Sequence, residues 1–294
     1  MILVELDKAG AEWVIVANLS GDENMLDVVR SGKSPHTRTG SLISGASEEL
    51  VEKEDDLVGV NTDPLLIEEL RQSISELNTS NYFLPRSMSI RQAGKKSNHG
   101  LNYDMRYKRF ALENEIQEKE AKTLVDLYHS AYPGIRVWHK TIQNQLRKDR
   151  TLVNCFGRKR KFLGAWGPDL FNAAYSFLPQ STTWDILRQG LIKTYNDTSI
   201  LFRPVEILTE VHDSFDFQYP TRPDDLAQVV HKISTDYLNS LCVYGSRKFY
   251  INTTVKIGFS YGNMKPIKLS DDIDSISKEI QDTLSRLRDA ETAQ

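Results

Sequence analysis

The chain has 294 residues, of which 39% are hydrophobic and 26% charged, and its formal net charge is −3. This composition is typical of a globular protein with one large domain or two small ones, and no run approaches the roughly 20 apolar residues of a membrane helix. The N-terminus lacks the basic flank of a signal peptide, and two cysteines are too few for a disulfide framework and indicate a reducing, cytoplasmic compartment.

The first part of the chain is predicted to begin with a strand that ends at Asp7, because Ile2, Val4 and Leu6 alternate with the residues between them. A helix over 11–19 follows. The central part is predicted to be largely helical, with two short strands around Gly157 after the last of its helices. These helices are expected at 64–77, 87–103, 110–130 and 134–148.

The C-terminal part is predicted to contain a β-hairpin between two helices. A helix at 180–196 precedes the strand-like runs EILTEV and FDFQY, which are joined at 211–214. A helix at 224–241 and a strand at 250–258 complete the globular part. Beyond Lys268, apolar residues spaced three or four apart predict one amphipathic helix, which packs on its own domain or docks on a partner.

Basic residues gather near the middle of the chain although the net charge is negative. Three basic clusters occur at 91–96, 106–109 and 157–161, whereas acidic residues gather at 48–56 and after Leu269. Each basic cluster alone is typical of a solvated face. Together they favour a shared anionic ligand.

Two aspartates stand at the ends of predicted strands. Asp7 follows the first strand, and Asp213 lies at the turn of the hairpin, next to His212. Alone, each is typical of a helix cap or a turn. If the strands are neighbours in one sheet, the carboxylates meet at its edge and offer the hard oxygen ligands that Mg²⁺ prefers. Two such ions, about 4 Å apart, activate a hydroxyl and stabilise a leaving oxygen at phosphorus.

Four residues recur at steps of four within the segment RQAGKKSNHGLNYDM. On a helix this spacing places Arg91, Lys95, His99 and Tyr103 on one slightly curving stripe. Two cations followed by two rings suit an elongated ligand with a polyphosphate at one end and a base at the other. The alternative is a surface helix with an ordinary polar face.

These segments together resemble the A-family DNA polymerases. The segment DKAGAEWVIVANLSGD is similar to the family's first palm motif, the stripe on the basic helix to its fingers helix, and Val211 to Ser214 to its Val-His-Asp-Glu motif. Shorter matches lie between them in the same order: His36-Thr37, YPGIRVWHKTI, FGRKRKF, PQSTTWDI and TVKIGFSYGNM. The resemblance covers about residues 1–267.

The resemblance implies a role for each matching residue. Asp7 and Asp213 would hold two Mg²⁺ ions with the Lys8 carbonyl, Glu12 would be the steric gate against a ribose 2′-hydroxyl, and His212 would contact the primer terminus. Lys95 would also stabilise charge on the leaving pyrophosphate. The residues expected to bind the nucleotide or the primer-template DNA are Arg91, Lys95, His99 and Tyr103 for the nucleotide, and Gln180 and Arg158 for DNA.

Four residues depart from the family pattern. His99 replaces Phe or Tyr, Asp104 replaces a Gly, Ser214 replaces a Glu near the metals, and Gly10 replaces a Gln near the gate. Stacking on His99 is therefore weakened, and the pivot of the fingers helix is altered.

The implied architecture is an α+β right hand, in which an antiparallel palm sheet carries an inserted helical fingers subdomain and the thumb is absent. The palm is expected at 1–30 and 150–267, the fingers at 31–149 and a helical tail at 268–294. Because family members reach the first aspartate only after a thumb, a second polypeptide is expected to supply the thumb and the exonuclease. The competing expectation is a decayed remnant.

The implied reaction is template-directed DNA synthesis from deoxynucleoside triphosphates, with no membrane involved, in the cytoplasm of a bacterium or a phage-infected cell. A single-subunit RNA polymerase shares part of the pattern, but Glu12 favours deoxyribonucleotides. A non-catalytic nucleic-acid-binding subunit remains an alternative, although it gains nothing from two like charges at one edge. The six histidines lack the spacing of a metal hydrolase.

Overall fold

The computed structural model describes most of the chain, in two compact units. The described residues are 1–59, 65–66, 68–69, 71–72 and 88–292. The first of the two units, here called the sheet unit, comprises 1–11, 154–158 and 180–294. The second, here called the helical unit, comprises 12–153 and 159–179. This division differs from the boundaries expected at 30 and 150, and the assignment of palm and fingers stays a prediction.

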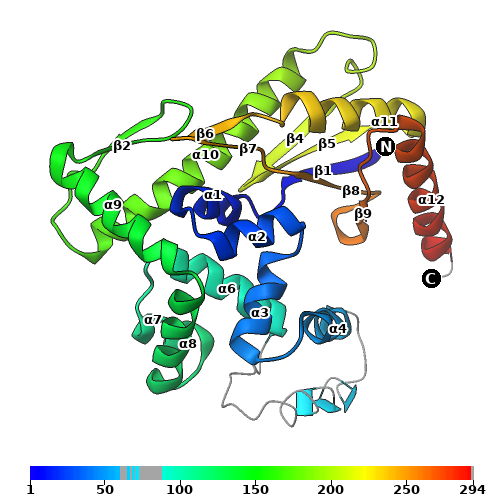
Figure 1. The fold of residues 1–294 in the computed structure, drawn as a ribbon. Coiled ribbons are helices and arrows are strands. Elements are labelled where there is room, and N and C mark those ends of the chain that lie inside the picture. The colour runs from blue at the N-terminus through cyan, green and yellow to red at the C-terminus, as the bar shows by residue number, and fades with distance from the viewer. Residues whose placement is uncertain (60–64, 67, 70, 73–87, 293–294) are drawn as a thin grey trace. The chain divides into compact units, whose positions relative to one another are not determined.

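The sheet unit is built on a five-stranded antiparallel sheet in the order β4-β5-β1-β8-β9 (Figure 1). The antiparallel sheet is as predicted, and the first strand lies at its centre, between the hairpin and β8. The strands are β1 Ile2–Lys8, β4 Glu206–Val211, β5 Ser214–Tyr219, β8 Thr253–Gly258 and β9 Lys265–Ile267. A separate two-stranded ribbon is formed by β6 Cys242–Tyr244 and β7 Arg247–Phe249.

The pleat of β1 separates a core face from a polar face. Ile2, Val4 and Leu6 are fully buried, whereas Glu5 and Asp7 point to the other side. The core face is covered by helices of the same unit, α11 Pro223–Lys232, α12 Ile273–Thr292 and the later part of α10 Pro168–Asn196. The core also includes Phe215, Phe217, Val255, Ile257, Leu187, Val229, Ile276, Ile280 and Leu284.

The helix predicted in the tail packs on its own unit, because Ile276, Ile280 and Leu284 lie in the core of the sheet unit. The tail helix was thus predicted correctly, but two helices of this unit were predicted with the wrong extent. The helix expected at 224–241 ends as a π-helix at Ile233–Tyr237 and is followed by β6, and the helix expected at 180–196 begins already at Pro168. Pro168 suits a first turn, where the missing N–H has no partner to lose.

Within the part of the chain that the structure describes, the helical unit contains eight further helices and the two short strands on either side of the turn at Gly157. The helices are α1 Ala11–Ser20, α2 Glu23–Ser31, α3 Pro35–Ser44, α4 Glu48–Gly59, α6 Ile90–Asn102, α7 Tyr107–Asn114, α8 Glu118–Ala131 and α9 Pro133–Asp149, and the strands are β2 Thr151–Val153 and β3 Lys159–Lys161. The single helix expected at 110–130 is two helices, because Glu115 adopts a left-handed φ of 55° and ends α7. Most of the helix expected at 64–77 lies outside the described residues. No helix in the described ranges has the length and apolar character to cross a membrane.

A buried amide, that of Asn98, joins four helices of this unit. Its Oδ1 accepts hydrogen bonds from Trp13 Nε1 at 3.0 Å and from the Thr39 hydroxyl at 2.8 Å, and it lies 3.1 Å from the Tyr128 hydroxyl. Its Nδ2 donates to the carbonyl of Pro35 at 3.0 Å. Asn98 is 2% exposed, so each of these groups depends on the others to replace water.

The contact between α3 and α6 leaves no space for a side chain at Gly94. A Cβ built there would lie 2.3 Å from the carbonyl oxygen of His36 and 2.6 Å from the backbone nitrogen of Gly40. The close approach brings α6 near enough for Asn98 to reach α3. Gly94 therefore allows α6, the helix that carries the predicted stripe, to pack closely against α3.

We expect Asn98→Ala to lower the free energy of unfolding by roughly 2 to 4 kcal/mol, because it leaves several buried donors without an acceptor. Urea denaturation of the purified chain measures the change. The matched control is Asn144→Ala, at an exposed position of α9, where a change within about 0.5 kcal/mol is expected. Equal effects of the two substitutions would contradict the central role of the Asn98 amide.

Candidate active site

The two predicted acids meet at one end of the sheet. Asp7 pairs with Ser214 across β1 and β5, and the backbone N–H of Lys8 donates to the carbonyl of Asp213 at 3.0 Å. The carboxyl groups of Asp7 and Asp213 are joined by a side-chain hydrogen bond. The turn between the strands is sharp, since His212 adopts a left-handed φ of 54°.

The acid pair is electrostatically strained. The pKa of Asp7 is raised from 3.8 to about 6, first by burial and then by the charge of Asp213 and the hydrogen bond with it. Lys256 lowers this pKa, but its ammonium is bound to Glu5 at 2.5 Å. The pair therefore carries excess negative charge that an added cation would relieve.

The side chain of Lys8 points away from the acids, into the sheet unit. Lys8 is 1% exposed, and its ammonium donates to the carbonyls of Leu238 and Ile251 and to the Thr253 hydroxyl. Burial lowers its pKa to about 8. The predicted role for Lys8 concerns only its carbonyl, and the structure gives its side chain a separate, structural role.

Further charged residues beside the acid pair were missed from the sequence. Asp216 is 4% exposed, stands on the same face of β5 as Ser214 and pairs with Glu5 across the sheet. Burial raises its pKa, and within the described residues its Oδ1 has no hydrogen-bond partner. The sequence pattern that could have identified Asp216 is the two-residue period of a strand, which places positions 5 and 7 on one face of β1 and positions 214 and 216 on one face of β5.

In the helical unit, the predicted gate residue contacts the end of the predicted stripe. The Tyr103 hydroxyl donates to Glu12, and His99 Nδ1 lies 3.7 Å from Glu12 Oε2. The rings of His99 and Tyr103 meet edge to face with centroids 5.7 Å apart. Tyr103 is 9% exposed, and burial raises the pKa of its hydroxyl.

The cations of the stripe on α6 lie toward the N-terminal end of the helix. Arg91 Nη1 lies 3.4 Å from Asp55 Oδ2, while Lys95 is exposed to solvent. His36 lies close to both, and its pKa is lowered to about 4 by burial and then by the charges of Arg91 and Lys95. The structure thus gathers Glu12, the stripe and the His36 segment into one cluster of the helical unit.

The remaining predicted DNA contacts lie on the sheet unit. Gln180 is exposed on α10, and His212 is exposed at the hairpin turn. Arg158 forms an ion pair with Asp185 of α10, with Nη2 2.6 Å from Oδ1. The functional roles of these residues stay predictions.

Comparison with known proteins decides the family. Residues 80–263, more than half of the chain, match DNA polymerase family A. The chain belongs to DNA polymerase family A.

The relatives of this family A chain are distant and much longer. The thermostable DNA polymerase I of Thermus aquaticus is 24% identical over 251 residues, which cover 82% of this chain and 25% of that protein. DNA polymerase I of Lactococcus lactis is 23% identical over 249 residues, covering 82% and 24%. The chain thus spans about a quarter of the length of these curated relatives.

A solved structure shows the same fold. It is the POL domain of Pol1 from M. smegmatis in complex with DNA primer-template and dNTP, and it superposes with a TM-score of 0.65 at 20% identity. The match covers 88% of this chain and 40% of that chain. The family and the α+β fold with an antiparallel sheet are therefore confirmed.

One departure from the family A pattern has a structural explanation. Asp104, which stands where the pattern has Gly, adopts a left-handed φ of 64° directly after α6. Asp is among the residues that tolerate this conformation best, and its carboxylate forms an ion pair with Arg136 of α9. An ion pair thus holds a position where glycine would offer only conformational freedom.

The acid pair fits the magnesium expected for family A. Two adjoining carboxylates with excess charge are hard oxygen ligands, and Mg²⁺ retains several waters, so it needs few protein ligands. No group of three or more His, Cys, Asp or Glu side chains in the described residues is arranged to hold a metal. Asp7, Asp213 and the Lys8 carbonyl are the groups that would hold it.

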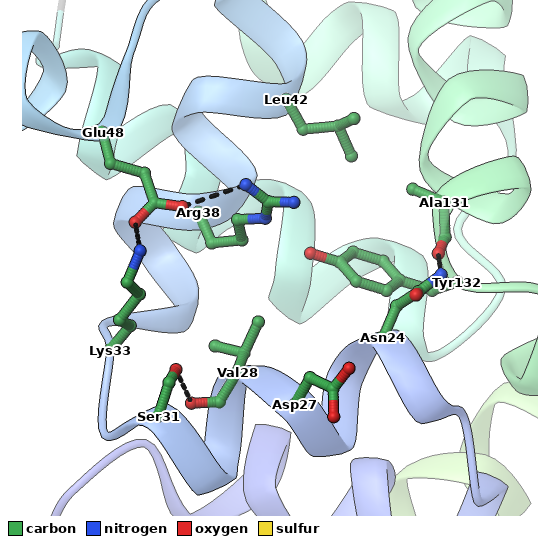
Figure 2. A pocket seen from close by; sticks show the side chains of 10 residues that line it. All are labelled: Asn24, Asp27, Val28, Ser31, Lys33, Arg38, Leu42, Glu48, Ala131 and Tyr132. Carbon is green, nitrogen blue, oxygen red and sulfur yellow. Dashed lines mark hydrogen bonds and ion pairs between the residues drawn. The ribbon is translucent and has the colours of Figure 1, made fainter.

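A shallow cavity in the helical unit lies apart from the predicted site residues, none of which lines it. Figure 2 shows Lys33 and Arg38 reaching Glu48 from two sides, each at 3.0 Å, while Tyr132 and Asn24 close the other end. The hydrogen bond from Lys33 is the first cause of the lowered pKa of Glu48. One acid thus engages both cations at this end of the cavity.

We expect Asp7→Asn to stabilise the metal-free chain by about 1 kcal/mol at pH 8, with allowance for partial exposure. The folded-state pKa of about 6 exceeds the unfolded value of 3.8, so ionisation of Asp7 destabilises the fold as pH rises through this window. Near pH 3, where Asp7 is protonated in both states, the gain should vanish. Urea denaturation at several pH values with EDTA measures it.

The control for this measurement is Asp126→Asn, at an exposed position of α8, where no comparable gain is expected. A gain that is the same at all pH values, or that also occurs in the control, would contradict repulsion within the acid pair as its cause.

Proposed function

We propose that this chain catalyses template-directed DNA synthesis, adding deoxynucleotides to a primer 3′-hydroxyl with release of pyrophosphate. The observation that carries the proposal is the acid pair: Asp7, in β1, and Asp213, in the turn between β4 and β5, are 206 residues apart and are held in contact despite like charge. Such strain persists where it serves a ligand, and it is the opposite of what a purely structural strand end requires.

The residues of the sheet unit would act on the primer end of the reaction. Asp7, Asp213 and the Lys8 carbonyl would hold two Mg²⁺ ions, which when bound supply activation of the hydroxyl and charge stabilisation at the leaving oxygen. The backbone hydrogen bond from Lys8 to Asp213 holds both acids in register without using their carboxylates. His212, at the turn, would contact the primer terminus, and Gln180 and Arg158 would contact the primer-template duplex.

The residues of the helical unit would act on the incoming nucleotide. Arg91 and Lys95 would bind its phosphates and stabilise charge on the pyrophosphate, and Lys95 would be the proton donor. His99 and Tyr103 would contact its base and sugar. Glu12, held by the Tyr103 hydroxyl, would exclude a 2′-hydroxyl by position and by unfavourable desolvation.

The decisive experiment is primer extension with Mg²⁺ and all four deoxynucleotides. Asp7→Ala and Asp213→Ala should each reduce the rate at least ~100-fold, since a direct ligand matters more than the outer-shell groups that cost 10–100-fold. Asp126→Ala is the matched control and should retain wild-type activity. Each protein is assayed alone and with the product of the upstream gene, because the relatives are about four times longer.

The outcomes separate the functional alternatives. Extension that both active-site substitutions abolish supports the polymerase, and extension only with the second protein supports a split enzyme. If neither condition gives extension and DNA binding is unaffected by the substitutions, the chain is a binding subunit or a remnant and the proposal fails. Ribonucleotide incorporation at the deoxynucleotide rate would instead indicate an RNA polymerase.

We expect Glu12→Ala to increase the ribonucleotide-to-deoxynucleotide ratio of kcat/KM by roughly 10- to 100-fold, because removal of the side chain opens space for a 2′-hydroxyl. Single-nucleotide incorporation with matched triphosphates measures the ratio. Tyr103→Phe is the companion variant, since it removes only the hydroxyl that holds Glu12 and should give a smaller increase. An unchanged ratio in Glu12→Ala would exclude Glu12 as the gate.

A further inference from the structure

The helix α10 exposes a narrow stripe on the sheet unit. Gln180, Trp184 and Arg188 are exposed at steps of four, whereas positions 182, 183 and 185–187 between them are buried. Trp184 is 37% exposed, which is unusual for a large apolar ring beside fully buried helix positions. The resemblance that identified Gln180 and Arg158 assigns nothing to Trp184 or Arg188.

The indole of Trp184 is flanked by two guanidinium groups. The Arg158 Cζ lies 4.2 Å from the ring centroid and the Arg188 Cζ 4.8 Å from it. Both distances are within the range of a cation–π interaction. We call these three residues the Arg–Trp–Arg stack.

Two carboxylates orient the guanidinium groups from the buried side. Asp185 accepts from Nε and Nη2 of Arg158 at 2.6 to 3.1 Å, and Glu210 lies 3.3 Å from Nη1 of Arg188. The arginine side chains are 42% and 47% exposed, but those of Asp185 and Glu210 only 12% and 22%. The surface therefore presents mainly the cations.

The ion pairs of Arg158 and Arg188 do not use all the N–H groups of the two guanidinium groups, so the remaining ones can bind another ligand. Asp185 does not engage Nη1 of Arg158, and Glu210 does not engage Nε or Nη2 of Arg188. A guanidinium fixed by a carboxylate on one edge and a ring on its face has lost most of its freedom before it binds. Two such groups beside an aromatic ring suit a sugar-phosphate chain, which offers spaced anions and apolar sugars.

We infer that the Arg–Trp–Arg stack is a nucleic-acid contact, in which Arg158 and Arg188 bind phosphates of one strand and Trp184 packs against the intervening sugar. This inference rests on the proposed function, since it concerns the primer-template DNA of that reaction. Trp184 and Arg188 are the new binding residues, and Gln180, one turn before Trp184, extends the same stripe.

The test is binding of a fluorescein-labelled primer-template duplex, measured by anisotropy from about 50 to 300 mM salt. Trp184→Ala should weaken binding about 5- to 20-fold, and Trp184→Phe should retain most of it. Arg188→Gln should weaken binding and lower the slope of log affinity against log salt by about one, which the loss of a structural contact would not do. Melting temperatures verify that each variant is folded.

The matched control is Trp166→Ala, which removes another exposed tryptophan beside an arginine, with Arg150 Cζ 4.7 Å from its ring. It should bind as the wild type does. Unchanged affinity and salt slope in folded Trp184→Ala and Arg188→Gln would overturn the inference and leave the polymerase proposal intact. Binding is measured with the chain alone and together with the product of the upstream gene. No binding of the duplex by wild type under either condition would overturn both proposals. Binding of polyglutamate instead of DNA, with the same dependence on Trp184, would overturn the inference and indicate an acidic protein partner.

Discussion

The buried ammonium of Lys8 is the interaction on which the geometry of the sheet unit depends. It fixes the end of the central strand to the backbone carbonyls of Leu238 and Ile251, which lie outside the strands of the sheet. Because successive side chains of a strand point to opposite faces, a Lys8 directed inward requires Asp7 to point outward. The burial of one charge, with its lowered pKa, thus determines where the opposite charge stands.

Neighbouring carboxylates on the polar face of the sheet repel one another, whereas the core face is apolar. Asp7 contacts Asp213, and Glu5 opposes Asp216 one pleat away. Lys256 is the cation whose charge these neighbouring acids share. This face is therefore rich in acids although Ser214 stands where the resemblance implies a glutamate. The hydrophobic core beneath, which includes the fully buried apolar side chains of β1, is what maintains such an arrangement.

Local periodicity made the sheet and the stripe predictable. The alternation in β1 and the hairpin around Asp213 indicated that two acids meet, and steps of four placed Arg91 to Tyr103 on one face of α6. The break at Glu115 had no signal, since a left-handed non-glycine residue is set by tertiary contacts. The Arg–Trp–Arg stack could not be predicted either, because its members come from a loop and a helix. The place of Asp216 beside the acid pair depended on the register of β5 against β1, which the sequence does not specify. Family motifs indicated which residues to consider, but not their partners.

The amide of Asn98 has a consequence for how the sequence of this chain evolves. Trp13, Thr39 and Tyr128 come from three helices and contact one oxygen atom, so a substitution at any of them alters the surroundings of the other two. Their mutational effects are therefore not additive. Drift at these positions is expected to be concerted: an exchange tolerated in one lineage would be harmful in another that retains a different set of donors.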